Sequence, residues 1–260
     1  MPQLTDKVLI RAILETERPW AAYALADLEP GYCEHAVWFC AAAGIPAIVL
    51  LYRAFALPVL LAVGAARHLR SVLDEVDPVL DGAREVYVVV RPDVLPLLRE
   101  RYRVSHDKAM LCMVLAPQSY RPVAPNGVRR LGCADLERVQ SLYADGEATG
   151  EAPDFFMPVM LEQGVYYGVH EGDRLIAAAG THVVAPTVSI GALGNVYTRR
   201  DRRGRGLGTR VTSAVTNHLL GMKISTVVLN VRESNRAAIR VYEQLGFQTH
   251  CRYYEAIASR

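Results

Sequence analysis

A glycine- and arginine-rich segment in the second half of the chain has the composition of a phosphate-binding loop. It reads RRGRGLGT over residues 202–209, between a predicted strand at 188–198 and a predicted helix that starts at Leu207. Glycine lets backbone N–H groups turn toward one concavity, and the first N–H groups of a helix lack internal partners and carry partial positive charge. The segment therefore predicts a site for a diphosphate.

Two common phosphate loops do not fit this segment. A Walker loop ends in Gly-Lys-Ser/Thr, and a dinucleotide-binding loop reads GxGxxG before a strand with an acidic tip. Neither pattern is present, because the loop reads GRGLG and the next strand reads TVVLNV. The net charge of the chain is only +2, so a basic patch here is local. Nucleic-acid binding by the arginines stays open as an alternative.

A second motif lies one predicted helix and one predicted strand further on. It reads NRAAIRVYEQLGF over residues 235–247. Together, Arg203-Gly-Arg-Gly-Leu-Gly208 and this motif resemble the two conserved motifs of the GCN5-related N-acetyltransferase (GNAT) superfamily, and within it the FR47-like subset. The resemblance covers roughly Val128 to Ile257. It implies a mixed α/β fold with a GNAT arrangement in the C-terminal half.

The resemblance also implies acetyl-CoA as co-substrate and assigns residues to it. Strand backbone would bind the pantetheine arm, and loop amides would bind the diphosphate. The residues implied to bind the cofactor are Val196, Tyr197, Thr198, Arg203, Gly204, Arg205, Gly206, Leu207, Gly208, Thr209 and Asn235. Asn235 is equally suited to be a plain helix N-cap. Tyr242 is similar to the family's general acid, which protonates the leaving thiolate, and its alternative is a core tyrosine.

The acceptor side is less specific. Phe155 and Phe156 fall where the family forms the acceptor wall, and they fit a hydrophobic core equally well. The general base stays unresolved, with His182, Glu171, Asp154 or a water chain as candidates. His182 lies on a predicted strand, where a histidine is more often a packed, hydrogen-bonded residue. No metal site is expected, because the five cysteines are scattered and no CxxC pair occurs.

The N-terminal half has a similar order of predicted strands and helices. We therefore expect a degenerate GNAT-like domain at 1–120, a linker, and the catalytic domain at 126–260. The very apolar run at 36–66 is interrupted by Pro46, Arg53 and Pro58, which favours buried strands over a membrane helix. The helix predicted at 93–102 lacks the second motif's Asn-x-x-Ala start and Gly-Phe exit. This half should not bind coenzyme A in the family manner.

These observations predict an N-acetyltransferase that moves an acetyl group from acetyl-CoA to a primary amine of a small molecule or peptide. A non-catalytic acyl-CoA binding or sensing module is the alternative. We expect a cytoplasmic monomer or homodimer without a nucleic-acid or membrane partner. Hydrophobic residues make up 51% and charged residues 22% of the chain, which is typical of a globular protein with a filled core.

Overall fold

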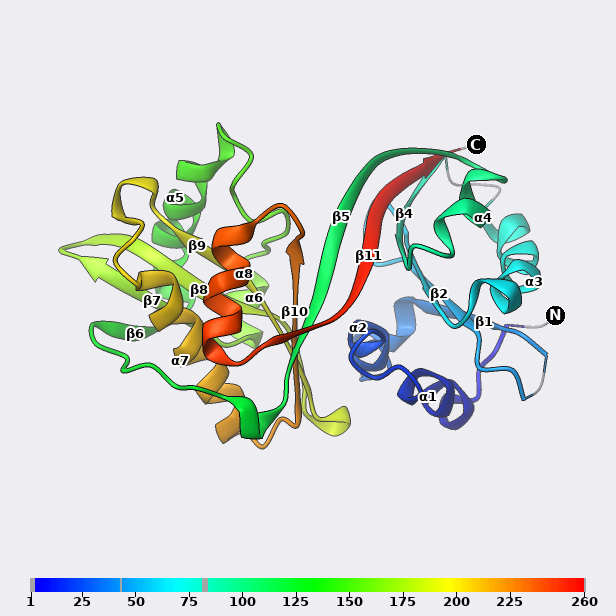
Figure 1. The fold of residues 1–260 in the computed structure, drawn as a ribbon, viewed down its shortest axis with the longest axis horizontal. Coiled ribbons are helices and arrows are strands. Elements are labelled where there is room, and N and C mark those ends of the chain that lie inside the picture. The colour runs from blue at the N-terminus through cyan, green and yellow to red at the C-terminus, as the bar shows by residue number, and fades with distance from the viewer. Residues whose placement is uncertain (1–2, 43, 81–83, 260) are drawn as a thin grey trace. The chain divides into compact units, whose positions relative to one another are not determined.

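The chain forms two compact units in its three-dimensional structure, which is a computed structural model that describes residues 3–42, 44–80 and 84–259 (Figure 1). The first unit runs to Cys112 and also takes in Arg232–Ser234 and the segment from Thr249 onward. The second unit consists of Met113–Val231 and Asn235–Gln248. The last strand of the chain thus belongs mainly to the first unit.

The first unit is a mixed sheet packed with helices. Its helices are α1 (Lys7–Glu15), α2 (Ala22–Ala26), α3 (Ala66–Val76) and α4 (Leu95–Arg99). Its strands are β1 (Ala36–Cys40), β2 (Ile48–Tyr52), β3 (Val59–Val63), β4 (Glu85–Val90), β5 (Arg103–Leu115) and β11 (Gln248–Ser259). The order is β1-β2-β3-β4-β11-β5. Strands β3 and β4 are parallel, whereas β11 is antiparallel to β4.

The apolar run at 36–66 forms β1, β2 and β3, as the interruptions predicted. In β2 all five residues are buried, which explains why this strand shows no alternation of polar and apolar residues. Within the described ranges, no helix combines the length and apolar character needed to cross a bilayer.

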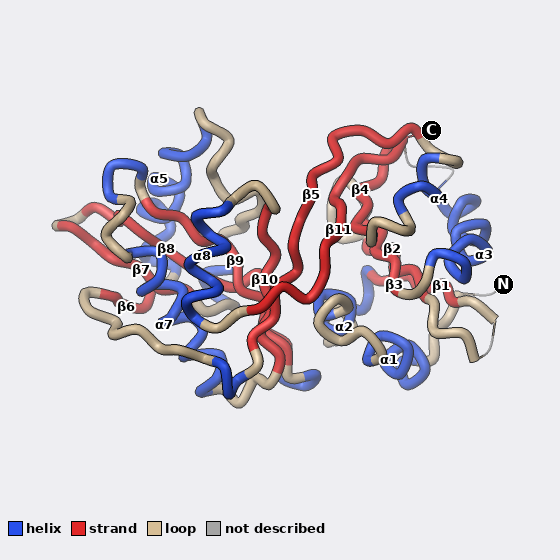
Figure 2. The backbone as a smooth tube through the Cα atoms, viewed as in Figure 1, coloured by secondary structure: helices blue, strands red, loops and turns tan. Residues whose placement is uncertain are grey.

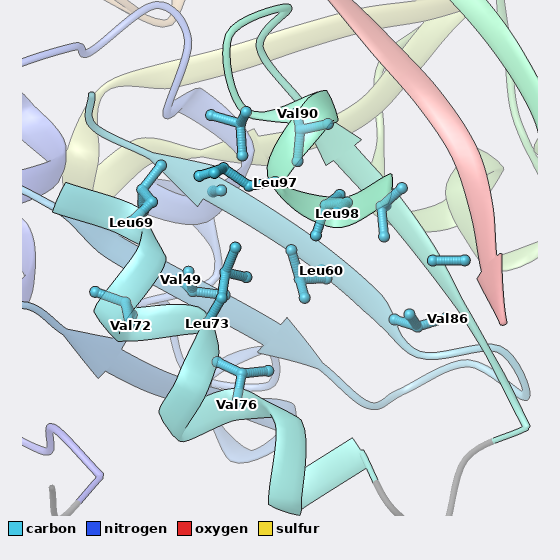
Figure 3. Packing of buried hydrophobic residues seen from close by; sticks show 14 of the residues in the cluster. Val49, Leu60, Leu69, Val72, Leu73, Val76, Val86, Val90, Leu97 and Leu98 are labelled. Atoms are coloured by element: carbon cyan, nitrogen blue, oxygen red, sulfur yellow. The ribbon is translucent and has the colours of Figure 1, made fainter. Parts of the chain in front are cut away.

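Helix α3 supplies much of the first unit's core. Its buried residues Leu69, Val72, Leu73 and Val76 follow the spacing of one helical face. They pack with Val49 and other apolar side chains of the sheet, as Figure 3 shows. Full burial of one such side chain stabilises the fold by roughly 1.5–3 kcal/mol.

The strands of the second unit pair with one another in the order β10-β9-β8-β7-β6. Its strands are β6 (Val128–Leu131), β7 (Tyr166–Glu171), β8 (Arg174–Ala185), β9 (Ile190–Thr198) and β10 (Thr226–Arg232). Its helices are α5 (Leu136–Glu147), α6 (Val159–Gln163), α7 (Leu207–Gly221) and α8 (Arg236–Leu245). The strands from β6 to β9 pair antiparallel, and β10 is parallel to β9.

The two faces of the sheet formed by β6 to β10 carry different helices. Tyr167 of β7 bonds His218 of α7, with 3.0 Å between its hydroxyl and Nδ1. Its neighbour Tyr166 points to the opposite face, where its hydroxyl lies 3.7 Å from Sδ of Met160 in α6. Helices α7 and α8 therefore lie on one face, and α5 and α6 on the other (Figure 1). This arrangement decides which residues can surround a ligand on each side.

Several predicted boundaries differ from the observed ones. Helix α6 begins only at Val159, because Pro153 and Pro158 keep the preceding segment non-helical, and this puts Phe155 and Phe156 on a loop. The helix predicted at 93–102 is the shorter α4. The last strand, β11, falls within the domain predicted at 126–260 and pairs with β4 from Tyr254↔Val90 to Ser259↔Glu85.

Candidate functional site

Strand β9 is distorted in the middle of the second unit's sheet. Asn195 has a φ of 53°, a left-handed conformation that asparagine tolerates better than most residues. On either side of it, the pairing with β8 changes from Gly180↔Gly194 to Ala178↔Tyr197, so β9 contains one residue more than β8. This is a β-bulge, which bends the strand and redirects its side chains.

The bulge lies just beyond the point where β9 separates from β10. In the described strands, the β9–β10 ladder has four residue pairs, from Thr226↔Ile190 to Leu229↔Leu193. The Arg199 N–H donates to the Ile176 carbonyl on the β8 side. Because backbone groups alternate along a strand, those of Val196 and Thr198 face the β10 side. A ligand between the two strands would therefore meet these groups first.

The backbone groups of Val196 and Thr198 thus face β10, whereas Tyr197 lies differently; that these three residues bind the cofactor stays a prediction. The Tyr197 backbone faces β8 and its ring is buried in the core of the second unit. Its hydroxyl donates to Oδ2 of Asp145 over 3.0 Å. The Thr198 carbonyl accepts a bond from Nε of Arg203 over 3.2 Å, so this loop arginine braces the end of the strand.

The glycine-rich loop joins β9 to an uncapped helix. Gly204 and Gly206 have φ of 77° and 69°, and open space surrounds both. Gly206 is the N-cap of α7, and within the described chain no side chain caps this helix. The first amide with a helical acceptor is that of Arg210, which donates to the Gly206 carbonyl over 3.1 Å. The N–H groups of residues 207–209 are therefore available at the helix end.

The arginines around the loop are largely engaged with carboxylates. Arg199 pairs with Asp145 at 2.9 Å, Arg202 with Glu171 at 2.6 Å, and Arg203 with Glu151 at 2.9 Å. The Arg210 guanidinium donates to the carbonyls of Asn126 and Arg205. These side chains hold the loop in shape, while the side chain of Arg205 is exposed. The backbone amides, more than a cluster of free guanidinium groups, define the anion site.

Helix α8 presents Asn235 and Tyr242. Asn235 is the N-cap, and its Oδ1 accepts the Ala238 N–H over 3.1 Å. Tyr242 is buried and packs edge-on against Phe247 with 6.1 Å between ring centroids. Burial raises the pKa of Tyr242, so the phenol keeps its proton at neutral pH. The described residues form no recorded hydrogen bond with this hydroxyl, which suits a group that donates to a ligand.

The exit of α8 fixes the position of these aromatic rings. Gly246 has a φ of 101°, and a Cβ there would lie 2.0 Å from the Ser119 carbonyl oxygen. Only glycine fits this close approach. The Phe247 N–H then donates back to the Tyr242 carbonyl over 3.0 Å.

On the opposite face of the sheet, the bulge organises a polar network. The Asn195 Nδ2 donates to the Tyr166 hydroxyl over 2.7 Å, and its Oδ1 lies 3.3 Å from Nε2 of His182. The Tyr143 hydroxyl donates to the Asn195 carbonyl over 2.8 Å. The His182 ring packs against Gly194, where a Cβ would come within 2.3 Å of it. Burial lowers the pKa of His182, and the Asn195 bond opposes this effect.

The two predicted acceptor-wall residues have different environments. Phe156 packs edge-on against Tyr143 and Tyr166 at 5.2 and 6.1 Å and is half-buried. Phe155 is 37% exposed, with its ring edge-on to His182 at 6.2 Å. Phe155 therefore lies beside His182 at the surface, whereas Phe156 mainly supports the core.

Sequence reasoning missed Asn195 and Tyr143, and it left Tyr166 undecided between the substrate pocket and the core. The Gly194-Asn195 pair inside a strand is the available signal, because both residues favour a bulge. The two tyrosines give no such signal. Their positions in a helix and a strand predict burial of the ring but not the hydrogen-bond partner of the hydroxyl. In the described ranges no group of three or more metal-ligating side chains occurs; that no metal takes part stays a prediction.

The fold of this chain is that of the GNAT acetyltransferases. A Drosophila protein of known structure, 14% identical, matches with a TM-score of 0.72 over 100% of this chain and 98% of its own. A tandem GNAT protein from the clavulanic acid biosynthesis pathway, 16% identical, matches with a TM-score of 0.60 over 99% and 97%. At these identities the likeness concerns the fold alone. It confirms the predicted α/β class with a GNAT arrangement and a second, similar domain.

Sequence comparisons match the C-terminal part of the chain to known proteins. Residues 166–255 match the family described as FR47-like protein. A mycothiol acetyltransferase from Tsukamurella paurometabola is 36% identical over 110 residues, which are 41% of this chain and 37% of that relative. The chain thus spans well under half of that relative's length. This part of the chain is therefore similar to the FR47-like family, in agreement with the two motifs.

Proposed function

We propose that this protein transfers an acetyl group from acetyl-CoA to a primary amine of a small molecule or peptide. The observation that carries the proposal is the uncapped N-terminus of α7 behind an open glycine turn, next to the strand edge where β9 leaves β10. The FR47-like match and the acetyltransferase relative support the reaction class.

The donor would occupy this junction in two parts. The diphosphate would accept bonds from the N–H groups of residues 207–209, where the helix dipole also favours negative charge. The pantetheine arm would lie along β9 and bond the backbone of Val196 as an added strand does. This places the thioester near the bulge at Asn195. Asn235, already an N-cap, would order the start of α8 beside the arm.

The chemistry would be direct attack. The amine nitrogen forms a bond to the thioester carbon, and the C–S bond breaks as the tetrahedral intermediate collapses. The Val196 N–H, just past the bulge, would stabilise the oxyanion. Tyr242 would give its proton to the leaving thiolate, and burial keeps that proton in place until then. The products are an N-acetyl amine and free coenzyme A.

His182 is the base that we favour for the acceptor amine. Burial holds its pKa below the usual value of 6.5, so the ring is neutral at pH 7 and can accept a proton. Glu171, a competing candidate, forms an ion pair with Arg202 at 2.6 Å. Asn195 orients the His182 ring, and Phe155 lies beside it, which suggests an acceptor with an apolar part next to its amine.

A non-catalytic acyl-CoA binding module is the second candidate. It is favoured by β9 itself, which reads IGALGNVYT and offers no carboxylate as base. This candidate shares the donor site but not the reaction.

Two measurements separate these functions. Calorimetry should show one coenzyme A per chain, and incubation of acetyl-CoA with a panel of amines should release coenzyme A thiol in step with acetylated product. Binding without thiol release across small amines, amino acids and peptides would favour the binding module. Absence of coenzyme A binding by the folded protein would exclude both.

A further inference from the structure

Two cysteines face each other on neighbouring strands of the first unit. Cys112 lies on β5 and Cys251 on β11, and these strands are adjacent in the sheet (Figure 2). Ser259 at the far end of β11 bonds the Arg103 carbonyl at the start of β5 over 3.4 Å. Cys112 lies at the Pro19 carbonyl, and Tyr253, two residues beyond Cys251 on β11, packs against Trp20, so both cysteines point to the same face of the sheet. A hydrogen bond between the two thiols shifts the pKa of both cysteines.

The two thiols differ in exposure and surroundings. Cys112 is 2% exposed, and its Sγ lies 3.5 Å from the Pro19 carbonyl oxygen. Cys251 is partly exposed and close to the Arg91 guanidinium, which pairs with Glu17 at 2.9 Å. One thiol is thus accessible beside a cation, and the other is buried behind it.

This environment favours the thiolate at one position only. Hydrogen bonding from Cys112, helped by Arg91, lowers the pKa of Cys251. The same thiol–thiol bond, together with burial, raises the pKa of Cys112. Reactive cysteines characteristically have a low pKa, partial exposure and a neighbouring thiol.

We propose that Cys251 and Cys112 form a reversible redox couple, in which Cys251 attacks an external disulfide and Cys112 resolves the product. In the first step, the Cys251 thiolate forms a bond to one sulfur of a small-molecule disulfide and expels one thiolate. In the second step, Cys112 loses its proton, attacks Cys251 Sγ and expels the second small thiol. The external disulfide is reduced to two thiols, and one protein disulfide is formed.

The disulfide would join β5 to β11, two strands that are far apart in the sequence. Each of these strands also has residues in the second unit. A covalent link between them restricts the unfolded chain, so the oxidised protein should unfold at a higher temperature than the reduced one. The site takes small disulfides or thiols as its ligand class, independently of the proposed acetyl transfer.

Oxidised glutathione is the probe that tests this couple on the full chain. Peptide mapping without reductant should recover one peptide pair that links Cys112 to Cys251. The Cys112→Ala variant should stop as a glutathione adduct on Cys251, and Cys251→Ala should form no internal disulfide. In the reduced protein, iodoacetamide at pH 7 should modify Cys251 about tenfold faster than Cys133, although Cys133 is more exposed.

Cys133→Ala is the matched control and should leave disulfide formation unchanged. Thermal unfolding of the wild-type protein in glutathione buffers provides a second readout that does not depend on a variant folding. If Cys133 reacts first, or if the native protein forms no Cys112–Cys251 link in oxidising buffer, the couple does not exist.

Discussion

Each unit contains a strand that is followed by a helix and then by a parallel partner strand: β3-α3-β4 in the first unit and β9-α7-β10 in the second. The two units differ in whether the protein itself hydrogen-bonds the N-terminus of the helix. In the second unit, α7 starts at Gly206 with free backbone amides and no capping side chain in the described chain. In the first unit, α3 starts after Ala65, and the N–H of Ala66 donates to Oδ2 of Asp93 over 3.3 Å. A carboxylate from the protein occupies the place where a phosphate would bind in the other unit.

The exposed backbone edges of β3 and β9, beyond their pairing with the parallel partner strand, also differ in whether the protein itself bonds them. Beyond the last β3–β4 pair, Leu61↔Val89, the Ala62 carbonyl accepts the Trp20 indole N–H over 3.1 Å. Trp20 is buried, and its ring packs at a tilt against Tyr253 with 5.1 Å between ring centroids. The corresponding edge of β9 around Val196 faces no such side chain in the described residues. In the first unit, therefore, a side chain of the protein bonds the strand backbone at the position where we propose that the pantetheine arm binds in the second unit.

The difference shows what turns a structural joint into a ligand site. Every helix start leaves amides that need acceptors, and a fold can supply these acceptors itself or leave them for a ligand. Glycine at 204, 206 and 208 keeps side chains away from the amides of α7, whereas Gly64 before α3 is packed so tightly that a Cβ would lie 2.6 Å from the Pro46 carbonyl oxygen. The predictions below exchange or remove these features.

The largest effect is expected when the acidic plug of the first unit, the Asp93 carboxylate at the start of α3, is reproduced at the start of α7. Gly208→Asp places a carboxylate at the start of α7, where an added Cβ meets only Thr198 Oγ1 at 3.5 Å. At about 4 Å, repulsion from one phosphate charge costs roughly 4 kcal/mol at an intermediate dielectric. This repulsion should lower the affinity for coenzyme A, measured by calorimetry, by about 100-fold or more. The full repulsion would give a larger loss, but salt screens part of it.

Gly208→Ala is the matched control and should bind coenzyme A nearly as well as the wild type. An acidic residue in the first turn favours the helix, so the unfolding temperature of Gly208→Asp should stay the same or rise. Retained coenzyme A binding in Gly208→Asp would show that the diphosphate binds elsewhere.

Tyr242→Phe should have the next largest effect. The phenol ring stays in place against Phe247, but the proton for the thiolate is lost, so kcat should fall about 100-fold. Coenzyme A affinity should hardly change, because the proposed role is confined to the chemical step. Steady-state kinetics with an accepted amine and calorimetry together check this. A variant with unchanged turnover would leave Tyr242 as a core tyrosine.

A smaller effect is expected at His182. His182→Gln should lower kcat/KM about tenfold at neutral pH, since water can partly replace the base. The wild-type rate should fall as the pH drops through the His182 pKa, which lies below 6.5, and the variant should lack this acid limb. Because the Asn195 bond raises the pKa, Asn195→Ala should move the limb to lower pH and also reduce the plateau, as the ring is no longer held.

His218→Gln is the control for the pH profile. His218 lies on α7 and bonds Tyr167 on the other face of the sheet, and its own pKa is also lowered by burial. Its substitution should leave the acid limb in place. An acid limb that disappears with His218→Gln, or persists in His182→Gln, would assign the titration to another group.

Local sequence patterns predicted the parts of the site that depend on few neighbouring residues. The turn at Gly204 and Gly206, the N-cap at Asn235 and the exit at Gly246 all follow from the conformational range of one residue type. The three strands of the apolar run followed from its interruptions.

The features that could not be predicted depend on partners distant in the sequence. Trp20 reaches a carbonyl on β3, Arg203 finds Glu151 in a loop before α6, and β11 pairs with β4 from the other half of the chain. Such contacts are fixed by tertiary packing. The local periodicity of a single sequence does not show which distant residues will meet. The bulge at Asn195 lies between these cases. The neighbouring Gly194 indicates a bulge, but the sequence does not predict the hydrogen-bond network around Asn195.

The smallest effect is expected when the plug of the first unit is removed. Asp93→Ala deletes the acceptor of the Ala66 N–H and should lower the free energy of unfolding by about 1 kcal/mol, the usual value of a helix cap. Asp93→Asn keeps an acceptor oxygen without the charge and should lose less. Neither variant should gain a second coenzyme A in calorimetry, because Trp20 still holds the Ala62 carbonyl and Gly64 leaves no room at the turn. A second equivalent of coenzyme A bound by Asp93→Ala would mean that one carboxylate alone separates the packed joint from the ligand site.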